Sequence, residues 1–194
     1  MQRPSGHATP ANQIARAFRS QGFSLVELMV TIAVAAILLA IATPSFTSII
    51  NSNRLSSAAN EMVATLQTAR MEAVRRNTTV QVCGSNDQTT CDGGNVAWIA
   101  LVADGDGNGV ADDAEVLRVS AFHPAVQASI GTGDLAFRAD GFARDAGDPD
   151  GVLLNTSFRF CIPTTQPTEN VRVVSIGSGS RISTDSKDGG GTCT

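Results

Sequence analysis

The acids between residues 104 and 115, in the stretch DGDGNGVADDAE, have the most specific spacing for chemistry in the chain. The stretch fits the pattern D-x-[DN]-x-[DN]-G-x5-E, in which a loop wraps around a calcium ion. Calcium takes about 6–8 hard oxygen ligands. Without a cation, the clustered carboxylates would repel one another. The candidate calcium ligands are Asp104, Asp106, Asn108, the backbone carbonyl of Val110, Asp112 and Glu115.

A plain hairpin turn is the alternative interpretation of this stretch. The residues on either side, 97–102 and 116–121, have the pattern of strands, whereas the usual calcium loop of this type joins two helices. Asp, Asn and Gly dominate turns because their side chains or backbone accommodate tight local geometry. The sequence leaves both interpretations open.

Four cysteines, Cys83, Cys91, Cys161 and Cys193, lack CxxC spacing and a histidine cluster. A zinc site is therefore not expected, and an even count in an exported domain favours disulfides. Cys83 with Cys91 would close a short loop, and Cys161 with Cys193 would hold the C-terminal tail. Four cysteines allow three pairings, so the connectivity stays open.

Catalysis has little support in the sequence. The two histidines are His7, near the N-terminus, and His123, which precedes a proline at a predicted turn. No nucleophile–base pair or phosphate-binding glycine loop accompanies them. The sequence predicts a binding or structural protein without enzymatic activity.

A single acid, Glu27, interrupts the apolar stretch from Phe23 to Phe46. The stretch is long enough to cross a bilayer as a helix, which needs about 20 residues. Arginines upstream predict a cytoplasmic N-terminus, with the rest of the chain across the membrane. An ionised carboxylate in hydrocarbon costs roughly 2.5–3.5 kcal/mol on insertion scales, so Glu27 calls for a functional reason. A cleaved secretory signal is disfavoured, because the small residue Gly22 precedes the apolar core instead of following it.

An amphipathic helix and a set of short strands are predicted after the apolar stretch. Apolar residues at three- and four-residue spacing predict that the helix continues as an amphipathic half, residues 47–77, with a kink possible at Pro44. Short strands separated by turn residues follow, which predicts an α+β fold in which the helix packs on antiparallel sheet. The predicted strands are 78–83, 96–102, 115–121, 126–130, 135–138, 157–161, 170–176 and 181–183, and the Gly-rich tail 185–194 is expected to be mobile unless Cys193 anchors it.

The stretch GFSLVELMVTIAVAAILLAIATPSF resembles the signal and N-terminal helix of type IV pilins and pseudopilins. The resemblance implies a leader, residues 1–22, that a prepilin peptidase removes between Gly22 and Phe23, followed by N-methylation of Phe23. It also implies that Glu27 meets the N-terminal ammonium of a neighbouring subunit, since each charge then offsets the desolvation of the other. The expected domains are the leader, a transmembrane half at 23–46, an amphipathic half at 47–77 and a β-rich domain at 78–194.

The later segments Trp98–Val102, Asp104–Glu115, Phe137–Gly141 and Ser175–Arg181 resemble the order of motifs in the GspH/FimT group of minor pilins and pseudopilins. The apolar segment is closer to the FimT type. The resemblance implies an inner-membrane precursor that an assembly platform builds into a pilus with other pilins. The alternatives are a GspH-type pseudopilin that contacts secreted proteins and a DNA-binding pilin that uses Arg181. Residues 78–194 carry a net charge of about −8, a poor match for DNA phosphates.

Overall fold

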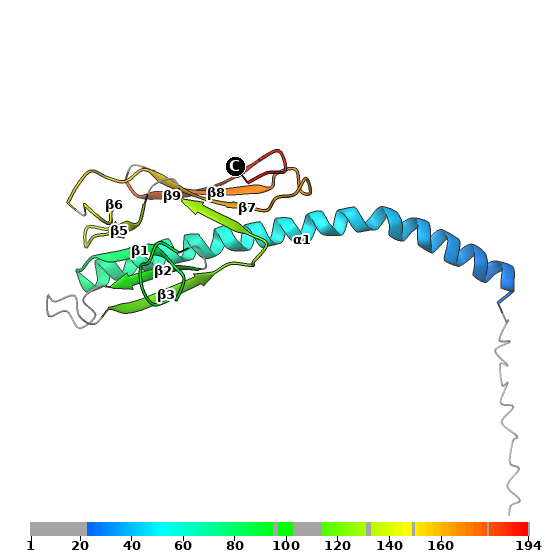
Figure 1. Ribbon diagram of the computed structural model, residues 1–194, viewed down its shortest axis with the longest axis horizontal. Coiled ribbons are helices and arrows are strands. Elements are labelled where there is room, and N and C mark those ends of the chain that lie inside the picture. The colour runs from blue at the N-terminus through cyan, green and yellow to red at the C-terminus, as the bar shows by residue number, and fades with distance from the viewer. Residues whose placement is uncertain are drawn as a thin grey trace, which may run out of the picture. The chain divides into compact units, whose positions relative to one another are not determined.

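The structure, a computed structural model, describes residues 23–94, 97–102, 114–130, 133–148, 150–177 and 179–193. One long helix, α1 (Leu25–Arg76), precedes all the strands. The strands are β1 (Val80–Ser85), β2 (Ala97–Val102), β3 (Glu115–Ala121), β4 (Gln127–Ile130), β5 (Leu135–Phe137), β6 (Ala143–Asp145), β7 (Thr156–Cys161), β8 (Val171–Gly177) and β9 (Arg181–Lys187). Figure 1 shows this order along the chain. A long N-terminal helix followed by antiparallel strands confirms the predicted α+β fold.

The chain divides into two compact units between Ile41 and Ala42. The first unit contributes the first third of α1, up to Ile41. The second, residues 42–194, holds the rest of α1 and both sheets. The helix is continuous through residues 42–44, which include the proline.

Local sequence sets both ends of α1. At the start, the hydroxyl of Ser24 accepts a hydrogen bond from the backbone N–H of Glu27 (3.2 Å) and so caps the first turn. At the end, Asn77 takes a left-handed conformation (φ 54°), and the N–H of Thr78 donates to the carbonyl of Ala73 (3.1 Å). This six-to-one hydrogen bond is that of a Schellman motif, in which Asn tolerates the left-handed position.

The strands form two antiparallel sheets within the second unit. The five-stranded sheet has the order β3-β2-β1-β5-β6, and the four-stranded sheet has the order β4-β7-β8-β9. Strand β1 pairs with β2 and with the distant β5, so it lies at the centre of the first sheet. Strand β2 is buried along its whole length.

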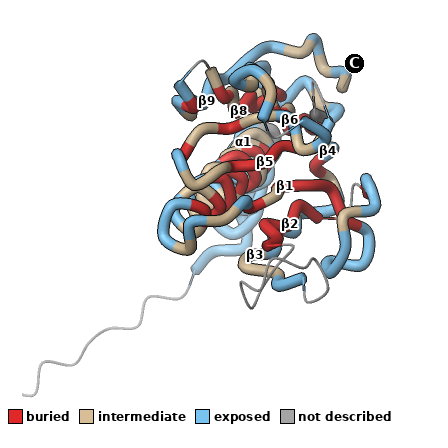
Figure 2. Tube along the Cα trace, turned by 90° about the vertical axis from the view of Figure 1, so that its left-hand side faces the viewer, coloured by how far each residue is buried: buried red, intermediate tan, exposed pale blue. Residues whose placement is uncertain are grey.

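One hydrophobic core joins the C-terminal half of α1 to both sheets. The apolar residues of α1 that face it recur every three or four positions, as the sequence predicts: Leu55, Ala59, Met62, Leu66, Ala69 and Ala73. Val82 and Trp98 contribute from the first sheet, and Phe158 and Ile176 from the second. Figure 2 shows the buried face of α1 turned toward strands of both sheets.

The predicted strands agree with the observed ones within one or two residues, with two exceptions. Strand β6 was not predicted, because it is only three residues long and one of them is an aspartate. Strand β9 runs four residues beyond its predicted end at Ser183. The side chains of β9 are polar and largely exposed, so the sequence does not favour a strand there. Pairing with the buried strand β8 stabilises the extended conformation.

Disulfides join Cys83 with Cys91 and Cys161 with Cys193. The second bond holds the described tail together with Asn170, which is fully buried. The amide of Asn170 donates to the carbonyls of Ile162 (2.9 Å) and Thr192 (3.2 Å), and its oxygen accepts from the N–H of Gly189 (2.8 Å). The tail is therefore anchored at the end of the four-stranded sheet.

Candidate assembly and recognition sites

The N-terminal unit presents a long exposed apolar surface. Within α1, an 18-residue window near the N-terminus has a mean hydropathy of 2.7, and none of it is buried. Large side chains from Phe23 to Ile41 are half or more exposed. A surface of this size on a water-soluble protein would be covered by lipid or by a partner. By length and composition, this helix can cross a membrane.

Glu27 lies in the first turn of α1, where it also has a local structural role. Ser24 and Glu27 have the S-x-x-E spacing of a capping box, and Ser24 caps the Glu27 N–H. A carboxylate in the first turn also interacts favourably with the positive end of the helix dipole. The spacing alone could have revealed this role. Any test of Glu27 in assembly must therefore separate capping from intersubunit charge pairing.

The acidic stretch lies mostly outside the described residues, since 103–113 are not described. Glu115, the last candidate calcium ligand, begins β3 and accepts from the guanidinium of Arg76 at 2.5 and 3.1 Å. The hydrogen bond from Arg76 holds the pKa of Glu115 below its usual value. Arg76 also forms an ion pair with Glu72 at 2.9 Å. No group of three or more metal-ligating side chains occurs among the described residues. A calcium ion that used both oxygens of Glu115 would have to displace Arg76.

The calcium site stays a prediction with a direct test. On the calcium interpretation, millimolar calcium should raise the melting temperature of the full chain, because the ion would relieve repulsion within residues 104–115; on the hairpin-turn interpretation, it should not. Asp106→Asn should weaken the shift, whereas Arg76→Gln should strengthen it by freeing Glu115. Differential scanning fluorimetry against magnesium measures both effects. An unchanged melting temperature at millimolar calcium would leave the hairpin turn as the correct interpretation.

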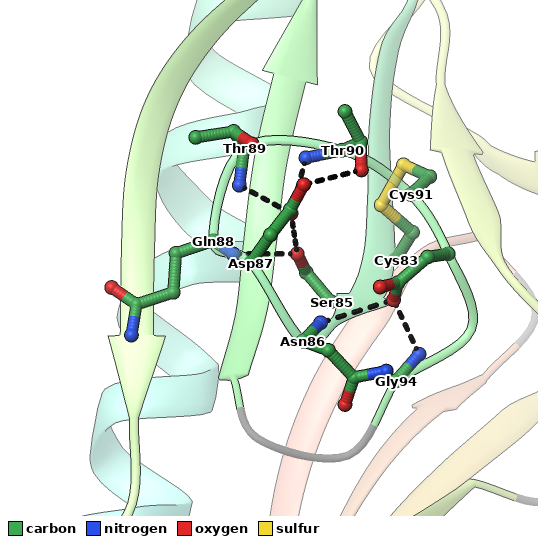
Figure 3. The surroundings of a disulfide bond; sticks show 10 residues. Cys83, Ser85, Asn86, Asp87, Gln88, Thr89, Thr90, Cys91 and Gly94 are labelled. Carbon is green, nitrogen blue, oxygen red and sulfur yellow. Dashed lines mark hydrogen bonds between the residues drawn. A yellow bond between two sulfur atoms is a disulfide. The ribbon is translucent and has the colours of Figure 1, made fainter.

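The loop closed by the Cys83–Cys91 disulfide begins in β1, and its residues 86–90 are exposed (Figure 3). The carboxylate of Asp87 accepts from the N–H groups of Thr89 (2.9 Å) and Thr90 (2.8 Å) and from the hydroxyl of Ser85 (2.9 Å). The bonds from Thr89 and Thr90 hold the pKa of Asp87 far below its usual range. The N–H groups of the loop thus bond to a carboxylate within the loop, where the N–H groups of a strand would bond to the carbonyls of a neighbouring strand.

Arg181, the candidate DNA contact, begins β9 and is exposed. The preceding turn is fixed to the rest of the second unit. Ser180 is buried, its hydroxyl accepts from the N–H of Ala143 (2.6 Å), and its carbonyl accepts from the guanidinium of Arg70 (3.1 Å). Arg181 is therefore held at a defined place on the surface. The sequence alone does not reveal these roles of Ser180 and Arg70, because both depend on contacts between residues far apart in the sequence.

The predicted sites remain separate within the second unit. The Cys161–Cys193 disulfide ties β7 to the tail, Arg181 lies at the opposite end of β9 from the tail, and Glu115 lies at the C-terminal end of α1 beside Arg76. Glu27 belongs to the first unit.

The sequence of the chain matches two models of known protein families. A family model described as type II transport protein GspH matches residues 58–179, more than half of the chain. The chain belongs to the GspH family. A second model, the prokaryotic N-terminal methylation motif, matches residues 18–43, which include Gly22, Phe23 and Glu27. The chain is thus a protein of the minor pilin and pseudopilin class, as the sequence predicts, and this class is structural rather than catalytic.

Solved structures were also compared with this GspH-family chain. The type IV minor pilin FimU of Pseudomonas aeruginosa is 25% identical, with 69% of this chain and 90% of that chain covered and a TM-score of 0.49. The minor pseudopilin EpsH from the type 2 secretion system of Vibrio cholerae is 10% identical, with 69% and 97% covered and a TM-score of 0.48. None of the curated proteins compared with the chain matches it.

Proposed function

We propose that this chain is the precursor of a minor type IV pilin that primes or caps a pilus. The observation that carries the proposal is the exposed apolar half of α1 with its single acid, directly after a glycine–phenylalanine junction inside the methylation motif. Prepilin peptidase would cut between Gly22 and Phe23, and Phe23 would then be methylated.

The leader and the helix support a defined topology. Three arginines and no acid precede Phe23, which favours a cytoplasmic N-terminus in the inner membrane. The second unit would then lie in the periplasm, where the disulfides Cys83–Cys91 and Cys161–Cys193 can form. An inner-membrane assembly platform would lift the processed subunit into the filament.

Assembly would depend on the helix half that the fold leaves uncovered. Its apolar side chains would exchange lipid for the helices of neighbouring pilins. Glu27 would pair with the N-terminal ammonium of a neighbour, since neither charge is stable alone in hydrocarbon. The β-rich unit would remain outside the helical bundle and present its loops to partners.

A genetic experiment tests the pilus role. Deletion of the gene should reduce the number of surface pili, and the native chain supplied in trans should restore it. Secretion of folded exoproteins should be unchanged in the same strain. A secretion defect with normal piliation would favour the alternative, a GspH-type pseudopilin of a type II secretion system that contacts secreted proteins.

Binding of DNA during natural transformation is the other alternative, and Arg181 is its candidate residue. The exposed position of Arg181 supports access, whereas the acidic charge of residues 78–194 opposes binding to phosphates. A mobility-shift assay at low salt with Arg181→Gln as the control tests it. A shift that is identical in the two proteins, or no shift, would remove Arg181 from the proposal.

A further inference from the structure

A recess lies between α1 and the end of β3, entirely within the second unit. Its volume is about 100 Å³, enough for a small polar group rather than a single water molecule. It is lined by Arg54, Ser57, Ala58 and Glu61 from α1, by Ala121 at the end of β3, and by Phe122 and His123 directly after β3.

The recess carries hydrogen-bond donors that are not used elsewhere in the described chain. Arg54 is half-buried, and its guanidinium has no hydrogen-bond or ion-pair partner among the described residues. The Nδ1 atom of His123 accepts from the N–H of Ala125 (3.1 Å), so in the neutral ring the proton is on Nε2. Ser57 adds a hydroxyl group at the same wall.

The charge of the recess suits an anion. Its carboxylate, Glu61, is paired with Arg118 at 2.6 Å and is thereby neutralised. The charge of Arg54 is then left over, on a unit that is acidic as a whole. An oxyanion in the recess would accept charge-assisted hydrogen bonds from the guanidinium of Arg54.

The approach to the recess is apolar. Phe46, Ile50 and Arg54 are four residues apart, so they form one row along a single face of α1. Phe46 is 63% exposed and Ile50 is 49% exposed. An apolar row that ends at a cation suits an amphiphile, because the acyl chain can contact the row and the anionic headgroup can contact the cation. An acidic protein segment would leave the apolar row without a matching partner.

We propose that this recess binds the phosphate of an anionic phospholipid, with the acyl chain along Phe46 and Ile50. Arg54, Ser57 and the Nε2–H of His123 would donate to the phosphate oxygens. The inference rests on the proposed membrane anchoring of the chain, and it adds a specific lipid contact where α1 leaves the membrane. Bound lipid would hold the β-rich unit close to the bilayer before assembly.

The test uses the processed full-length chain in detergent. Native mass spectrometry and thermal shift measure its binding of phosphatidylglycerol and of phosphatidylcholine with the same acyl chains. We expect phosphatidylglycerol to bind at a several-fold lower concentration, and Arg54→Gln to lose at least about fivefold, as expected for charge-assisted hydrogen bonds. Arg181→Gln, which removes an equal charge elsewhere on the surface, should bind as the native chain does.

Several results would overturn the proposal: equal binding of the two lipids, unchanged binding by Arg54→Gln, or an equal loss in Arg181→Gln. Displacement of phosphatidylglycerol by millimolar inorganic phosphate is expected, since the phosphate is the recognised group. If phosphate displaces the lipid no better than chloride does, the apolar row alone holds it and the proposed site is wrong.

Failure of this proposal can be distinguished from failure of the pilin role. Arg54→Gln should be cleaved between Gly22 and Phe23 as the native chain is. Glu27→Gln should bind phosphatidylglycerol normally, because Glu27 lies outside the recess. Normal lipid binding without cleavage would contradict the pilin role alone, and normal cleavage without lipid selectivity would contradict the lipid site alone.

Discussion

Glu27→Gln is expected to reduce the incorporation of this chain into filaments by at least about tenfold. Glutamine keeps the shape and the capping-box chemistry of the first turn, and it removes only the charge. In the proposed filament, the ammonium of a neighbouring Phe23 would then lack its counter-ion. Breaking a buried ion pair from one side costs about 3–5 kcal/mol, which exceeds the 1.4 kcal/mol that corresponds to a factor of ten.

Ser24→Ala is the matched control for Glu27→Gln. It removes the hydroxyl that caps the Glu27 N–H and keeps the carboxylate. Loss of an N-cap costs about 1 kcal/mol, so this variant should keep most of its incorporation. The measurement is the ratio of each variant in sheared filaments to its amount in membranes, with cleavage checked for each. Native-like incorporation of Glu27→Gln, or a larger loss in Ser24→Ala, would assign Glu27 to helix capping instead.

Removal of the Cys161–Cys193 disulfide should destabilise the β-rich unit more than removal of the Cys83–Cys91 disulfide. The bond spans 32 residues, whereas Cys83–Cys91 spans 8. The chain-entropy relation gives about 4 kcal/mol for the longer loop and about 2.5 kcal/mol for the shorter one. At about 2–4 °C for each kcal/mol in a domain of this size, Cys161→Ala with Cys193→Ala should lower the melting temperature by roughly 10 °C.

The tail contacts predict a further signature of this change. Without the disulfide, the described tail loses its covalent tie to β7 and keeps the hydrogen bonds of Asn170 to Thr192 and Gly189. Limited proteolysis should therefore cut after Lys187 in the double alanine variant and leave the native chain intact. The pair Cys83→Ala with Cys91→Ala is the control, and its melting temperature should fall less. A larger fall in this control, or no fall in either pair, would contradict the loop-entropy argument.

Local patterns in the sequence were sufficient to predict α1 and most of the strands. The stripe from Leu55 to Ala73 has helical spacing, and Asn77 ends the helix where apolar periodicity stops. Strand β7 alternates as expected, with Phe158 and Phe160 buried and Arg159 between them less buried. These features depend on neighbours in the sequence, so a single chain reveals them.

Features that depend on long-range pairing could not be predicted. The sequence gives no sign that β4 joins β7 in a second sheet, or that β1 pairs with β5. The short β6 and the polar end of β9 are strands only because of their partners. The recess at Arg54 likewise arises because α1 lies beside His123, 69 positions further along the chain. Such contacts follow from tertiary packing, which overrides local propensity.

The N-terminus of the mature protein tests the central claim most directly. Intact-mass and peptide mass spectrometry of the chain purified from its native membrane would identify the first residue and any modification on it. The account predicts a protein that begins at Phe23, with one added methyl group on its amine. A mature chain that begins at any other residue, or that keeps residues 1–22, would contradict it.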